Sequence, residues 1–148
     1  MSGLLTHSVN DVIRRLLINN GQGTLPSTAG SWPIGVERPD SPDDCVTITE
    51  TTGRRDGRTM TDGEVIEHPG IQVEVRSTDH NTGFLKAKQI ATYCDEQVRN
   101  SGVTFEGKHY NIINVSRVGV VMSIGRESPE SKRELFTFNA MVTLTQTN

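Results

Sequence analysis

The stretch HPGIQVEVRSTDHNTGFLKAKQIATYCDEQV, residues 68–98, decides the fold, because its hydrophobic period changes within one segment. Ile71, Val73 and Val75 alternate with polar residues, which predicts a strand with one apolar face. Beyond this strand the apolar positions recur at helical spacing, which predicts a helix over about 80–100 with Lys86 on its wet side. The predicted buried stripe of this helix is Phe84, Ala87, Ala91, Cys94 and Val98.

An amphipathic helix is also predicted near the N-terminus. Ser8 and Asp11 have the spacing of a capping box, and Gly21 is a plausible end. The polar positions Asn10, Asp11, Arg14 and Arg15 occupy one side of this helix. The opposite side is the predicted buried stripe, made of Val9, Val12, Ile13, Leu16 and Leu17.

The remaining segments are predicted to be strands joined by polar loops. Residues 45–51 form an alternating strand, and Trp32–Val36 is short enough to pair only at an edge. Residues 52–69 are predicted to be a long mobile loop or an extended hairpin. Further strands are expected at 110–115, 117–124 and 136–145. In the second of these, Val118, Val120, Met122 and Ile124 share one face; in the third, Phe136, Phe138, Ala140, Val142 and Leu144 do so.

These elements predict a single α+β domain over residues 1–148. The expected order is α-β-β-α-β-β-β, with an antiparallel-rich mixed sheet and two main helices packed on one face. A chain of 148 residues is long enough to bury a core. Fifteen Lys and Arg against eighteen Asp and Glu give a net charge of −3, so there is no strongly basic footprint for nucleic acid.

The cysteines and the N-terminus bear on the compartment. Cys45 and Cys94 are predicted to be buried free thiols, which fits a reducing environment. The first residues lack a basic head followed by an apolar run, and no apolar stretch is long enough to span a membrane. We therefore expect a soluble protein made in the cytoplasm.

The motifs that might carry chemistry are weak. Gly102–His109 approaches a phosphate-binding loop, but His109 replaces the metal-binding hydroxyl and the flanking elements are reversed, so a turn is favoured. The four histidines are scattered, and the acidic loop around Asp40 lacks the pattern of a calcium site. No Gly-x-Ser-x-Gly motif is present. We expect no catalytic residue, metal or cofactor.

A positive signal is the segregation of charge. Residues 37–50 are acidic and residues 51–60 are basic. Two oppositely charged loops are compatible with plain solvation, or with head-to-tail association of subunits into a ring. On the second interpretation the candidate contact residues are Glu37, Asp40, Asp43, Asp44, Arg54, Arg55 and Arg58.

In the order and spacing of these elements, the sequence resembles the tail-terminator or minor capsid protein family of long-tailed, siphovirus-like bacteriophages. The resemblance covers most of the chain and is poorest in residues 53–68 and 125–134. After the N-terminal helix it rests on GTLPSTAGSWPIGVERPDSP (23–42), DDCVTITETTG (43–53), HPGIQVEVRS (68–77), NTGFLKAKQIATYCDEQV (81–98) and VVMSIGRESPESKRELFTFNAMVTL (120–144).

The resemblance implies a structural virion protein at the head-proximal end of the tail. Such a protein caps the completed tail tube as a hexameric ring, stops polymerisation and offers a surface for head–tail joining. The implied partners are other copies of the chain, the tail tube protein and a head–tail connector protein, with DNA passing through the lumen without sequence-specific binding. No enzyme activity, cofactor or membrane is implied. The alternative is a head-completion or stopper-type connector protein.

Overall fold

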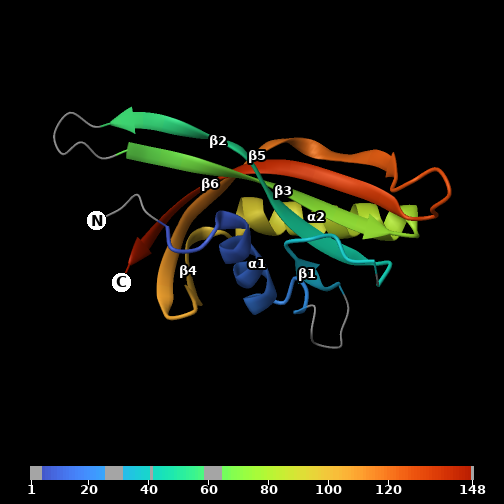
Figure 1. Cartoon of the computed structure of the whole chain (residues 1–148), viewed down its shortest axis with the longest axis horizontal. Helices are drawn as coiled ribbons and strands as arrows, with labels where there is room; N and C mark the ends of the chain where they lie inside the picture. The colour runs from blue at the N-terminus through green and yellow to red at the C-terminus, as the bar shows by residue number, and fades with distance from the viewer. Residues whose placement is uncertain (1–4, 26–31, 41, 59–64, 148) are drawn as a thin grey trace.

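The computed structural model describes residues 5–25, 32–40, 42–58 and 65–147, with the backbone alone described at 54–58, 65–67 and 147. Within these residues a curled mixed sheet of six strands is accompanied by two helices (Figure 1). The sheet order is β1-β2-β3-β6-β5-β4. The bounds are α1 Val9–Asn19, β1 Ile34–Gly35, β2 Cys45–Arg58, β3 Val65–Ser77, α2 His80–Glu96, β4 Arg99–Phe105, β5 Lys108–Arg126 and β6 Glu134–Thr147.

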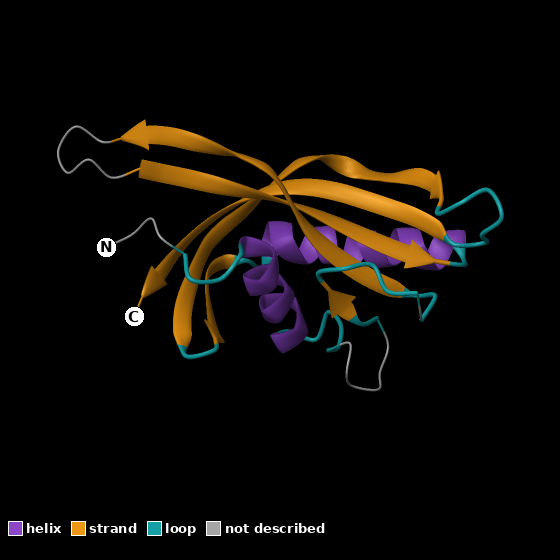
Figure 2. Cartoon of the chain, viewed as in Figure 1, coloured by secondary structure: helices purple, strands orange, loops and turns teal. Residues whose placement is uncertain are grey.

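The centre of the sheet is formed by β2, β3 and β6. In the antiparallel register Val73 pairs with Ile48 on one side and with Phe138 on the other, so the apolar positions of neighbouring strands share a face. Both helices lie on the same side of the curled sheet (Figure 2) and join these side chains in one core. The alternation expected for β3 and β6 is therefore confirmed.

α1 has the predicted buried stripe, with Val9, Val12, Ile13, Leu16 and Leu17 all buried. Ser8 is the N-cap residue, but its hydroxyl donates to the Asp11 carboxylate at 3.0 Å instead of capping the backbone. Gly21 follows the C-cap Asn20 and has φ +76°, a conformation that glycine adopts without strain. The predicted end of this helix is confirmed.

α2 begins where Asp79 accepts a hydrogen bond from the Thr82 backbone N–H at 3.0 Å. Ala87, Ala91 and Cys94 are buried as predicted. Phe84 was expected inside but is 36% exposed, and it meets the Phe136 ring edge-on with 6.3 Å between the ring centres, while Gly83 packs directly against that ring.

Lys86 was expected in water and is only 7% exposed. Its ammonium donates to the Gln22 carbonyl at 2.5 Å and lies 5.6 Å from the centre of the Trp32 ring, contacts between elements distant in sequence. These partners compensate part of the cost of burial, which lowers the pKa of Lys86.

The helix was expected to continue to residue 100, but it ends at Glu96 and residues 99–105 form β4. Asn100 has φ +49°, which a continuing right-handed helix does not allow. β4 pairs with β5 around the turn Glu106–Gly107, where both residues have positive φ. This is the geometry of a tight hairpin, so the preference for a turn over a phosphate-binding loop is confirmed.

The expected strands at 110–115 and 117–124 are one strand, β5, interrupted by bulges opposite β6. The order α-β-β-α-β-β-β is therefore wrong in detail, because the chain runs α1-β1-β2-β3-α2-β4-β5-β6. β1 lies inside the expected Trp32–Val36 run and pairs in parallel with β2 at the sheet edge. β2 and β3 stay paired as far as Arg58 and Val65, so this part of the 52–69 stretch is a hairpin, and residues 59–64 lie outside the described residues.

Candidate assembly surfaces

Arg76 of β3 forms hydrogen bonds with the backbone of the acidic segment, residues 37–44. Arg76 is 1% exposed, and its guanidinium donates to the Pro42 carbonyl at 2.8 Å and to the Asp43 carbonyl at 3.2 Å. It also donates to the Glu127 carboxylate at 2.8 Å. A buried arginine with a carboxylate and backbone acceptors fixes this segment against the end of the sheet.

Two more arginines complete this network. Arg38 donates to both carboxylate oxygens of Glu74 at 2.8 Å, above a small groove of about 200 Å³. Arg133 lies 2.7 Å from the Asp43 carboxylate and 3.5 Å from that of Glu127. Burial favours the neutral form of Glu127, but the hydrogen bond and charge of Arg76, with Arg133, lower its pKa overall.

The predicted acidic contact residues therefore fall into two groups. Glu37 and Asp40 are exposed on the loop between β1 and β2 and remain available to a partner. Asp43 is engaged by Arg133, and Asp44 is half-buried with one carboxylate oxygen enclosed. The last two residues contribute to the fold of the segment as well as to its charge.

The predicted basic residues lie at the other end of β2. The backbones of Arg54, Arg55 and Arg58 pair with His68, Glu67 and Val65 of β3, and their side chains lie outside the described part. From Asp44 to Arg55 an extended strand spans roughly 37 Å. The two charged segments are neighbours in sequence. The structure places them at opposite ends of one strand (Figure 1).

A surface that the sequence did not predict lies on the second half of β5. β4 pairs with β5 only as far as Asn114, so the outer edge of residues 115–126 has no strand partner among the described residues. Val118, Val120, Met122 and Ile124 were expected on one face of a strand, with no sign that the face was open. They are exposed by 47–74%, and Val121 turns into the core in their place. We call these four side chains the β5 strip.

The bulges of β5 account for the exposure of these side chains. Between Val118 and Met122 the strand gains residues relative to β6, and Gly119 there has φ +87°. A bulge changes which side chains point inward and is frequent beside functional surfaces. The sequence signal was present in Gly119 and Gly125, two glycines within a run of apolar residues.

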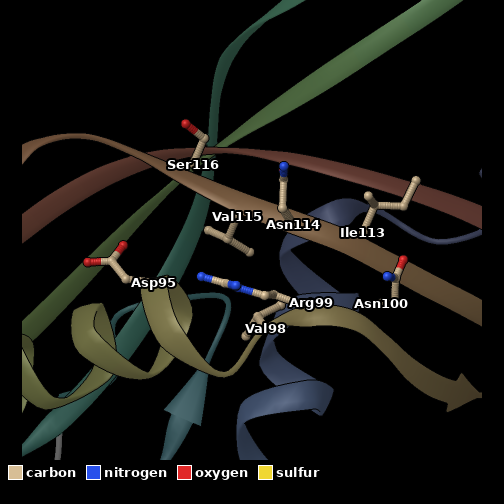
Figure 3. A pocket seen from close by; sticks show the side chains of 8 residues that line it. All are labelled: Asp95, Val98, Arg99, Asn100, Ile113, Asn114, Val115 and Ser116. Carbon is tan, nitrogen blue, oxygen red and sulfur yellow. The ribbon is translucent and has the colours of Figure 1, made fainter.

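A groove of about 440 Å³ lies at the start of the strip, between the end of α2 and β5 (Figure 3). Asp95, Val98 and Arg99 line one wall, and Asn114 and Ser116 line the other. The Asp95 carboxylate forms an ion pair with Arg117 at 2.9 Å. Among the residues that line it, no nucleophile is hydrogen-bonded to a base.

The histidines do not converge. His7 contacts Tyr110 and Glu106, His80 contacts Glu134, and His109 contacts Thr104. Among the described residues, no cluster of three or more His, Cys, Asp or Glu side chains could hold a metal ion. Cys45 and Cys94 are buried free thiols, as expected, and burial raises the pKa of Cys94 to about 12. No described helix is long and apolar enough to cross a membrane.

Comparison with known proteins adds a family to this geometry. A family model described as bacteriophage tail terminator protein matches residues 16–146. No curated protein matches the chain. Among solved structures, a chain from the virion of a native gene transfer agent particle superposes with a TM-score of 0.44 at 9% identity, covering 76% of this chain and 78% of the other.

Proposed function

The chain belongs to the bacteriophage tail terminator protein family, and from this premise we propose that it caps the finished tail tube as a hexameric ring. The ring stops tube polymerisation and presents a surface for joining the head. Its other partners are the tail tube protein and a head–tail connector protein. DNA passes through the lumen of the ring without sequence-specific contacts.

The observation that carries this proposal is the position of the charged segments within a terminator-family fold. Acidic residues 37–44 and basic residues 54–58 lie at opposite ends of β2. A subunit with different surfaces at its two ends associates head to tail, and such contacts close into a ring when the rotation permits. Two like surfaces would instead favour a two-fold dimer.

The mechanism needs no reaction. Each contact between subunits is weak alone, but contacts within a ring act at high effective concentration and add up to a stable cap. A ring seated on the last layer of the tube covers the surface on which the next tube subunit would add. Tube growth then stops because the surface for the next subunit is covered. The opposite face of the ring remains free for the head.

The test is to replace Arg54, Arg55 and Arg58 together by glutamate in a phage that lacks the wild-type gene. We expect weaker assembly by sedimentation, most clearly at low salt, and tails of uncontrolled length by electron microscopy. Exposed ion pairs contribute only about 0.2–1 kcal/mol each and are screened by salt, so single replacements should change little.

The matched control replaces Arg15, Lys88 and Lys108 by glutamate, which changes the net charge equally. It should leave tail length unchanged. Tails of normal length that join heads in the complete absence of the protein would refute the terminator function. Tails of normal length that remain unjoined would instead support a stopper-type connector.

A further inference from the structure

Two long strands of the sheet have open outer edges in the described part of the chain, and these edges lie on opposite sides of the strand order. Beyond its short pairing with β1, the outer edge of β2 has no strand partner from residue 48 to 58 among the described residues. The outer edge of β5 is likewise open over residues 115–126 in that part of the chain. Open edges present unpaired backbone donors and acceptors, and stable proteins protect them with charges or cover them.

Between Arg117 and Arg126 the β5 edge carries no charged side chain. The four side chains of the β5 strip are apolar, and Val120 is 74% exposed. β5 carries Lys108, Arg117 and Arg126 but no acidic residue. An apolar edge strand of this length in a virion component calls for a covering partner.

We propose that the β5 strip and edge of one subunit are covered by the β2 edge of a second copy, in antiparallel orientation. This inference rests on the proposed ring and names the surfaces that build it. Joining β2 of one copy to β5 of the next leaves the same two edges free at the ends. The addition therefore repeats until the last copy meets the first.

Charge complementarity selects this orientation. At the start of the free β5 edge, the Arg117–Asp95 pair marks the end of α2, where Asp95 and Glu96 are exposed beside Arg99. An antiparallel neighbour brings Arg54, Arg55 and Arg58 to this end. It also brings the acidic segment 37–44 to the other end, where Arg126 and Lys132 are exposed beside Glu130.

The other arrangements of two copies place like charges together. A parallel β2 neighbour would bring its basic end to Arg126 and its acidic segment to Asp95 and Glu96. Two β5 edges related by a two-fold axis would set Arg117 of each copy near Arg126 of the other, and like charges opposite each other on paired strands destabilise the pairing. The antiparallel β5–β2 contact avoids both conflicts.

The first experiment replaces Val120 by lysine in the full chain. Sedimentation should show that the protein concentration needed for half-assembly rises roughly tenfold or more, since an apolar side chain is replaced by a charge of the same sign as the arginines of the neighbouring β2. The matched control is Leu85→Lys on α2, whose side chain is 66% exposed and lies outside the proposed contact. It should assemble like the wild type, and both variants should keep the wild-type urea midpoint.

The second experiment identifies the occupant. Thr51 and Ser123 are both exposed, and a β5–β2 contact centred on the two free edges brings them together. Thr51→Cys with Ser123→Cys should yield a covalent ladder of copies on oxidation, which neither single variant should form, because Cys45 and Cys94 are buried.

Three results would overturn the inference. The first is a ring unaffected by Val120→Lys, and the second is an absent ladder in the double variant despite normal rings. The third is a Val120→Lys ring that forms normally but no longer binds the tube, which would assign the strip to the tube protein. All three leave the terminator function standing, whereas a wild-type chain that never assembles would refute the ring itself.

Discussion

The two halves of β5 have the same kind of sequence and opposite environments. In the first half, β4 and β6 pair on either side, and Tyr110 and Ile112 are buried. In the second half only β6 pairs, and the β5 strip is exposed. Apolar alternation therefore predicts a strand, but whether the apolar side is buried depends on the neighbours that the fold supplies.

The largest difference in the free energy of unfolding is expected between a substitution in the core and one in the β5 strip. Phe138 is 2% exposed between β3 and the helices, and Phe138→Ala should lower the free energy of unfolding by about 3–5 kcal/mol through lost burial and a cavity. Val120→Ala should change it by less than about 0.5 kcal/mol. Urea denaturation of the dissociated subunit measures both. Equal midpoints for the two variants would place Phe138 outside the core.

A somewhat smaller effect should distinguish the buried arginine of the acidic segment from a more exposed one in the same network. Arg76→Met leaves Glu127 and two backbone carbonyls without their buried donor, and we expect a loss of about 3 kcal/mol. Arg133→Met, which removes a more exposed partner of the same carboxylate, should cost clearly less. Equal shifts of the urea midpoint by the two substitutions would contradict this expectation.

The same network predicts a pH dependence. The folded-state pKa of Glu127 is lowered from its ordinary value of 4.5, so its contribution to stability is present above that value. It is lost as the pH falls through the lowered folded-state pKa. Glu127→Gln should therefore lose less stability than the wild type on acidification below pH 4.5, measured by urea midpoints at several pH values. Parallel pH profiles would count against this role.

The smallest effect concerns two glycines. A Cβ at Gly83 would lie 2.6 Å from the Phe136 ring, so Gly83→Ala should cost about 1–3 kcal/mol by overpacking, although alanine favours a helix. At Gly102 a Cβ would meet nothing within 4 Å, and Gly102→Ala should be nearly neutral. A Gly83→Ala variant as stable as the wild type would show that α2 does not pack closely on β6.

The sequence by itself determined the elements whose hydrophobic period is regular. The stripe of α1 and the alternation of β3 and β6 follow from local spacing, because side-chain direction repeats every 3.6 residues in a helix and every two in a strand. The order of these elements also led to the terminator family, which the match over residues 16–146 shows. The two charged segments were visible as composition.

Only the tertiary structure decided where those features lie. Lys86 is buried because Gln22 and Trp32 reach it from a distant loop, and Phe84 is partly exposed while Gly83 packs directly against Phe136. The charged segments are separated because the length of β2 lies between them. The β5 strip is open because β4 begins at Arg99, opposite Asn114, and because a bulge lies between Val118 and Met122. Each of these features depends on which strand or loop packs alongside the segment. The hydrophobic period of a segment does not specify those neighbours.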